Sequence, residues 1–144
     1  MCDDQVRIEI LDWDAAAPRV MPLREAVFVV EQGVAPELER DAFDPVCRHA
    51  VAETPDGTVV GTGRLLPDGH IGRMAVAASV RSRGIGGQIL DVLMREARSL
   101  GMNEVVLNAQ VQAQRFYARH DFVGEGDEFM EAGIPHRLMR RRLE

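Results

Sequence analysis

Alternating hydrophobic and polar positions near the start of the chain predict a strand, and a helical spacing follows it. In Val6–Leu11 apolar residues alternate with charged ones, as in a half-buried strand. Apolar residues recur at helical spacing in Leu23–Val30, and Pro22 suits the first turn of a helix. Gly33 marks the break. We expect Val34–Pro45 to form a loop or a short helix bordering a site.

The middle of the chain has the pattern of an antiparallel meander. Two Pro-Asp-Gly sequences separate three predicted strands, which are His49–Glu53, Thr58–Leu65 and His70–Val76. Pro presets one dihedral angle, Asp bonds the backbone and Gly accepts positive φ, so each sequence predicts a tight turn.

The second half changes to a helical period. Apolar residues between Ile85 and Leu100 lie on one helical face, and Gly101 suits a C-terminal cap. The remaining prediction is a short strand (Glu104–Leu107), a shorter helix around Phe116 and two final strands (Phe122–Phe129 and His136–Leu143). The order β-α-β-β-β-α-β-α-β-β indicates an α/β fold with a mixed, mostly antiparallel sheet and helices on both faces.

Composition narrows the class of protein. The 144 residues are 46% hydrophobic and 28% charged, which predicts one globular domain spanning 1–144. No apolar run approaches the length of a membrane span, and no signal peptide is visible, so we expect a cytoplasmic protein without a membrane partner. A net charge of −6 argues against nucleic acid as a partner. Cys47 and His49 lack the second pair that a tetrahedral metal site needs, so we expect no metal.

Acidic residues are concentrated in the first third of the chain. They are Glu31, Glu37, Glu39, Asp41 and Asp44. Such a stretch attracts a cationic ligand, although a solvated loop has the same composition.

The sharpest chemical signal is a basic, glycine-rich segment at the start of the helix predicted between Ile85 and Leu100. It consists of Arg81, Ser82, Arg83, Gly84, Ile85, Gly86, Gly87 and Gln88. Glycines at a helix start let an anion approach the free N–H groups of the first turn, where the helix dipole favours negative charge. Arginines add charge-assisted bonds to phosphate oxygens. The segment therefore predicts a diphosphate site.

Two common diphosphate folds do not fit. A dinucleotide-binding loop requires a third glycine where Ile89 stands, and it belongs to βαβ units rather than antiparallel turns. A P-loop requires a Gly-Lys-Ser/Thr sequence, which the chain lacks.

The segment and its context resemble the GNAT superfamily of N-acetyltransferases. The resemblance rests on Ile71–Val76 followed by Arg81-x-x-Gly84-x-Gly86, and on Asn108 followed by Phe116–Phe122. Further short motifs resemble its ElaA-like branch: Glu31–Val34, Asp41–Asp44, Val60–Leu65, Leu107–Gln110 and Gly133–His136. One departure is Asp121, where the superfamily usually has glycine, so the turn before Phe122 is in doubt.

The resemblance implies that the strands of Gly72–Val76 and Glu104–Leu107 are parallel and splay apart around the pantetheine of acetyl-CoA. Pantetheine would pair with backbone near Met74, Ala75 and Val76, whose N–H groups would stabilise the oxyanion. The remaining cofactor-binding residues would be Arg81–Gln88, Asn108, Phe116 and Tyr117.

Tyr117 is implied as the general acid that protonates the departing thiolate, although it can also be a packed aromatic anchor. For the general base we expect Glu31, with His136 and Asp44 as alternatives. Asn108 can hold water or substrate, or end its strand.

The residues expected to line the acceptor site are Glu31, Asp44, Arg64, Arg73 and His136. Arg64 and Arg73 can instead pair with nearby acids. We therefore expect an acetyl-CoA-dependent N-acetyltransferase that acts on a primary amine, with a cationic acceptor favoured, by direct attack in a ternary complex. A non-catalytic module that senses acyl-CoA is the alternative, and a homodimer formed through the last strand stays open.

Overall fold

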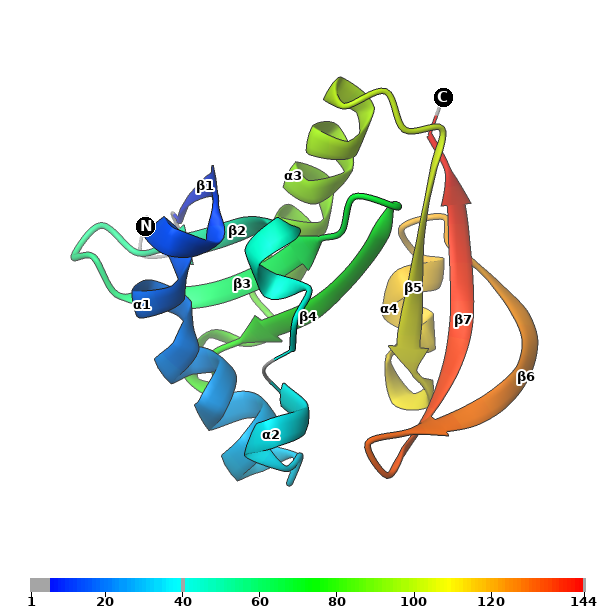
Figure 1. Ribbon diagram of the computed structural model, residues 1–144, viewed down its shortest axis with the longest axis horizontal. Helices are drawn as coiled ribbons and strands as arrows, with labels where there is room; N and C mark the ends of the chain where they lie inside the picture. Colours follow the sequence, from blue (N-terminus) through cyan, green and yellow to red (C-terminus); the bar gives the residue numbers. More distant parts are fainter. Residues whose placement is uncertain (1–5, 40, 144) are drawn as a thin grey trace.

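The protein is built around one mixed sheet. The computed structural model describes residues 6–39 and 41–143, and in this part the strand order is β1-β2-β3-β4-β5-β7-β6. Neighbouring strands are antiparallel except β4 and β5, which are parallel, so the predicted sheet type is confirmed (Figure 1). The strands are β1 (Arg7–Leu11), β2 (Arg48–Glu53), β3 (Val59–Leu65), β4 (His70–Val76), β5 (Glu104–Gln110), β6 (Val123–Glu131) and β7 (Ile134–Arg142).

Four α-helices connect these strands within the described residues. They are α1 (Trp13–Arg24), α2 (Pro36–Glu39), α3 (Ile85–Ser99) and α4 (Gln114–Ala118). Short 3-10 turns occur at Asp44–Val46, Ala78–Val80 and Val111–Ala113. None of the helices described is long and apolar enough to span a bilayer.

The first helix begins ten residues earlier than predicted. Asp12 caps it, because Asp12 Oδ1 accepts a hydrogen bond from the Ala15 N–H at 3.0 Å. Pro22 lies inside the helix, not in its first turn, and the chain continues as a π-helix over Glu25–Glu31. The predicted start at Leu23 was wrong because the alanine-rich first half of the helix carries little apolar contrast, which hides its periodicity.

Helices cover both faces of the sheet, as predicted. Alternate residues of β2 point to opposite faces. Val51 packs against Ala16 and Val20 of α1, whereas Ala50 and Ala52 join the cluster that contains α3.

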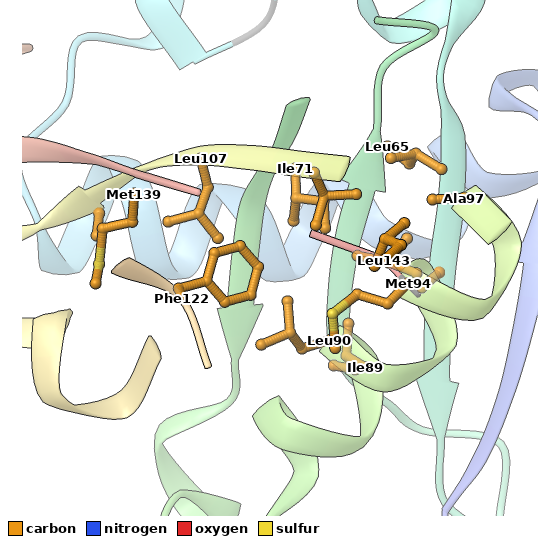
Figure 2. Packing of buried hydrophobic residues seen from close by; sticks show 14 of the residues in the cluster. Leu65, Ile71, Ile89, Leu90, Met94, Ala97, Leu107, Phe122, Met139 and Leu143 are labelled. Carbon is orange, nitrogen blue, oxygen red and sulfur yellow. The ribbon is translucent and has the colours of Figure 1, made fainter. Parts of the chain in front are cut away.

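The main core lies between α3 and the sheet. Two glycines of β3 allow the helix to approach closely, since a Cβ atom at Gly61 would lie 2.6 Å from Ile89 Cδ1 and one at Gly63 3.0 Å from Leu93 Cδ1. Figure 2 shows the buried side chains of α3 facing those of the strands and of Phe122. This packing fixes where the N-terminus of α3 lies relative to β4.

The parallel pair separates soon after it forms. β4 and β5 pair only at His70 with Val106 and at Ile71 with Leu107. The register between β3 and β4 then shifts at a bulge, and Arg73 there takes a positive φ of 48°. Residues 72–76 therefore have no strand partner on the β5 side, and the two strands diverge (Figure 1).

Candidate active site

A cavity of about 630 Å³ opens where β4 and β5 diverge. Its walls come from both strands, from the segment containing α2, from the β6–β7 hairpin and from α4. The side chains that line the cavity include Arg73, Met74, Asn108, Tyr117, Glu131 and His136. Elements far apart in the sequence thus contribute to one space.

The predicted diphosphate segment forms the entry into α3. Ser82 and Gly84 take positive φ values of 69° and 82°, and no side chain caps the first turn of the helix. Backbone N–H groups of that turn can therefore bind an anion. The residues present fit the diphosphate that was predicted for Arg81–Gln88.

The glycines of this segment have a second role that the sequence did not indicate. A Cβ atom at Gly86 would lie 3.5 Å from Phe116 Cζ, and one at Gly87 would lie 3.1 Å from His120 Cε1. The small residues therefore let the start of α3 pack against α4 and its end. His120 therefore lies beside the diphosphate segment.

Arg81 and Glu31 form a bidentate ion pair. The Arg81 Nη1 and Nη2 atoms donate to the two Glu31 carboxylate oxygens at 2.5 and 2.7 Å, and Nε donates to the Val76 carbonyl at 2.9 Å. These hydrogen bonds lower the pKa of Glu31. Glu31 is not among the residues that line the cavity. Its place beside the diphosphate segment does not favour it as the base that accepts the amine proton.

Tyr117 reaches the point where the strands separate. Its hydroxyl group donates to Met74 Sδ at 3.8 Å, and its ring packs edge-on against Phe116 and Phe122. Burial raises the pKa of Tyr117 to about 12. The phenol therefore stays protonated at neutral pH and can donate a proton at the divergence of β4 and β5.

His136 lines the cavity, and its ring is oriented by a contact with the backbone of its own strand. Its Nδ1 lies 2.7 Å from the Ile134 carbonyl oxygen, so Nδ1 must donate, and the neutral ring keeps its lone pair on Nε2. The ring is buried and stacks on Phe129 with a centroid distance of 6.0 Å. No hydrogen bond to Nε2 occurs among the residues that the structure describes.

Asn108 connects β5 to the tip of the β6–β7 hairpin. Its Nδ2 donates to Glu131 Oε1 at 3.0 Å. The hairpin turns through Ala132 and Gly133, both with positive φ, as a tight two-residue turn requires. Sequence reasoning missed Glu131, because only the register of β5, β7 and β6 brings it to this face.

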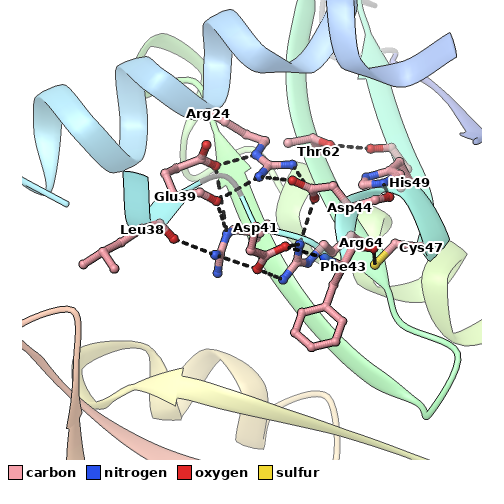
Figure 3. A network of polar contacts seen from close by, with 12 residues as sticks. Arg24, Leu38, Glu39, Asp41, Phe43, Asp44, Cys47, His49, Thr62 and Arg64 are labelled. Carbon is pink, nitrogen blue, oxygen red and sulfur yellow. Dashed lines mark hydrogen bonds and ion pairs between the residues drawn. The ribbon is translucent and has the colours of Figure 1, made fainter. Parts of the chain in front are cut away.

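Three acids of the acidic stretch, Glu39, Asp41 and Asp44, pair with arginines of the protein itself. Arg24 is buried and donates to Glu39 at 2.5 Å and to both oxygens of Asp44 at 3.0 and 3.1 Å. Arg64 donates to Asp41 at 2.7 and 2.8 Å and to Asp44 at 2.8 Å. Figure 3 shows the resulting network. The guanidinium of Arg64 holds the pKa of Asp41 down at about 2.

Arg73 belongs to the same network. It donates to the Glu39 carbonyl at 2.9 Å, to the Leu38 carbonyl at 3.1 Å and to Asp41 at 3.1 Å. Arg73 and Arg64 do line the cavity, but their guanidinium groups form ion pairs with acidic residues of the protein itself. Asp44 is almost fully buried between two arginines and is not placed to contact a substrate.

The departure at Asp121 does not alter the turn. Asp121 takes a positive φ of 68°, the conformation that glycine adopts readily and aspartate tolerates. Phe122 still reaches the core.

The separating parallel strands, the uncapped first turn of α3 and the partly buried tyrosine therefore lie close together in one part of the molecule. The sequence model of the acetyltransferase (GNAT) domain matches residues 19–143. The chain therefore belongs to the GNAT acetyltransferase family, and the resemblance described above is confirmed.

Relatives agree with this assignment. The uncharacterized N-acetyltransferase YjcF of Bacillus subtilis is 40% identical over 123 residues, covering 83% of this chain and 87% of YjcF. The crystal structure of an acyl-CoA N-acyltransferase from Pseudomonas aeruginosa has a TM-score of 0.84 at 31% identity and covers 95% of this chain and 99% of that one. Escherichia coli ElaA has a TM-score of 0.83 at 27% identity, with the same coverage.

Proposed function

We propose that the protein transfers the acetyl group of acetyl-CoA to a primary amine by direct attack in a ternary complex. The observation that carries this proposal is the protonated Tyr117 phenol beside Met74, at the unpaired edge of β4. A group that can donate a proton there serves a departing thiolate. This favours catalysis over the alternative, a module that only senses acyl-CoA.

The cosubstrate would lie along residues that the fold brings into line. Arg81–Gln88 would bind the diphosphate. Phe116 lies next to Gly86 of this segment. The pantetheine would pair with the free edge of Met74, Ala75 and Val76. Backbone N–H groups of that edge would stabilise the oxyanion.

The amine must lose a proton, since a lysine-like ammonium has a pKa of about 10.4. We place His136 Nε2 in the role of base, because it is an acceptor on the cavity wall. Glu31 is not chosen as the base because its carboxylate is paired with Arg81, and Asp44 is not chosen because its carboxylate is paired with arginines. Tyr117 donates its proton to the sulfur as the carbon–sulfur bond breaks.

Direct attack is supported by the state of Cys47. Its thiol is buried outside the cavity, and burial raises its pKa to about 11, so it is not a thiolate nucleophile. Cys2 lies outside the described residues.

Initial rates measured while both acetyl-CoA and amine are varied test the proposal. Thiol release gives the rate, and lysine self-acetylation does not contribute because none of the 17 basic residues is lysine. A ternary complex predicts reciprocal plots that intersect. Parallel plots would indicate an acyl-enzyme and overturn the mechanism.

A further inference from the structure

Glu131 is a carboxylate at the cavity that no described cation neutralises. It lies at the end of β6, is exposed, and lines the cavity. Its partner among the described residues is the neutral amide of Asn108. That contact orients the carboxylate but leaves its charge uncompensated.

The other charges facing the cavity cancel. The α2 segment contributes Glu39 and Asp41, β3 contributes Arg64, and β4 contributes Arg73. Behind them, Arg24 pairs with Asp44. Two acids and two arginines at the wall balance one another, which leaves Glu131, among the residues that the structure describes, as the carboxylate without a matching arginine.

Apolar side chains lie among these balanced charges on the wall that contains α2. Phe28, Leu38 and Phe43 line it, and the Leu38 and Phe43 side chains are 56% and 55% exposed. Exposed large apolar groups beside a polar site commonly mark where a ligand binds. An acceptor lying here would contact apolar side chains on one side and a carboxylate on the other.

We propose that Glu131 selects the acceptor: a small primary amine with an apolar body and no carboxylate. This inference rests on the proposed function. An amino acid is disfavoured for two reasons. The charges of Arg64 and Arg73 are already balanced by Glu39, Asp41 and Asp44, so the wall offers no net positive charge to a carboxylate. Glu131 would also repel the carboxylate.

The reaction balances with groups already described. Glu131 attracts the ammonium form to the cavity, and His136 Nε2 takes one proton. The free nitrogen lone pair then forms the bond to the acyl carbon. As the carbon–sulfur bond breaks, its electron pair takes the Tyr117 proton and coenzyme A leaves as the thiol, and the second proton on the nitrogen restores the Tyr117 phenol, which leaves a neutral amide. Glu131 is a binding residue here, since it attracts the amine without exchanging a proton.

The test compares phenethylamine with L-phenylalanine, which differ by one carboxylate. Thiol release with acetyl-CoA is measured for the unmodified protein, for Glu131→Gln and for Glu128→Gln. Glu128 is exposed on the same strand and does not line the cavity, so its variant changes the net charge equally. Acetyl-CoA binding is measured separately from thermal unfolding.

We expect the unmodified protein to prefer phenethylamine by at least about threefold in kcat/KM, as expected for one exposed, partly screened charge. Glu131→Gln should raise the KM for phenethylamine about threefold with little change in kcat, and should reduce the preference. Glu128→Gln should behave like the unmodified protein.

Equal or better use of phenylalanine overturns the inference, as does an unchanged KM in Glu131→Gln. Inactivity with both amines while acetyl-CoA still binds overturns it as well, and leaves the proposed function standing for other acceptors. If acetyl-CoA does not bind, the proposed function fails and the inference fails with it.

Discussion

Replacing Tyr117 with phenylalanine separates catalysis from folding. The substitution removes one hydroxyl group and leaves the ring contacts with Phe116 and Phe122 in place. The lost hydrogen bond is weak, since its acceptor is the Met74 sulfur at 3.8 Å. We expect a loss of stability below about 1 kcal/mol.

The catalytic effect should be much larger. Loss of a general acid typically costs about 10²-fold or more, equivalent to about 2.7 kcal/mol in the barrier. Because burial holds the pKa of Tyr117 at about 12, the phenol remains the donor through neutral and moderately alkaline pH. The rate of the unmodified enzyme should therefore not decline from ionisation of this group below about pH 11.

The assay is single-turnover acetyl transfer to a good amine acceptor, with urea unfolding and acetyl-CoA binding measured on the same preparations. Tyr117→Phe should bind acetyl-CoA normally and transfer the acetyl group about 10²-fold more slowly. A single-turnover rate equal to that of the unmodified enzyme would reduce Tyr117 to a packing residue and refute the proton-donor role.

Three further predictions concern the surroundings of the site. The pKa of Asp41 is depressed from 3.8 to about 2, so the stability that its ionised form contributes is nearly complete above about pH 4 and is lost as the pH falls towards 2. Asp41→Asn should therefore lower the free energy of unfolding in urea by about 2 kcal/mol at pH 7 and by about half that at pH 3. A loss that does not depend on pH would contradict the ion-pair account. Glu31→Gln should lower the KM for acetyl-CoA a few-fold by freeing Arg81, with kcat unchanged, whereas a roughly 10²-fold fall in kcat would restore Glu31 as the base. Gly86→Asp should abolish coenzyme A binding, measured by calorimetry, while Gly86→Ala retains it; binding by the aspartate variant would remove the diphosphate site from Arg81–Gln88.

Local patterns in the sequence were enough to predict most of the fold. The Pro-Asp-Gly turns, the amphipathic period of α3 and the glycine that follows it are all short-range signals. The start of α1 was missed because alanine and proline weaken the helical periodicity of its apolar residues. Asp12, which caps the helix, is a sequence signal for its start.

The acceptor side of the site could not be predicted in the same way. Whether Asp44 and Arg64 face a substrate or each other depends on contacts between segments about twenty residues apart. The pairing of Glu31 with Arg81 spans fifty positions. Glu131 comes to the cavity through strand register, which the composition of β6 does not reveal. Short motifs were enough to propose a cosubstrate side because most of its residues are contiguous.

Thermal unfolding with and without acetyl-CoA tests the central claim most directly, with NAD as the comparison ligand. At about 100 times its dissociation constant, acetyl-CoA should add roughly 2.7 kcal/mol and raise the melting temperature by on the order of 10 °C. A rise with acetyl-CoA and none with NAD is the predicted result. No rise with acetyl-CoA, or an equal rise with NAD, would contradict the assignment of this cleft to an acetyl-CoA-dependent transferase.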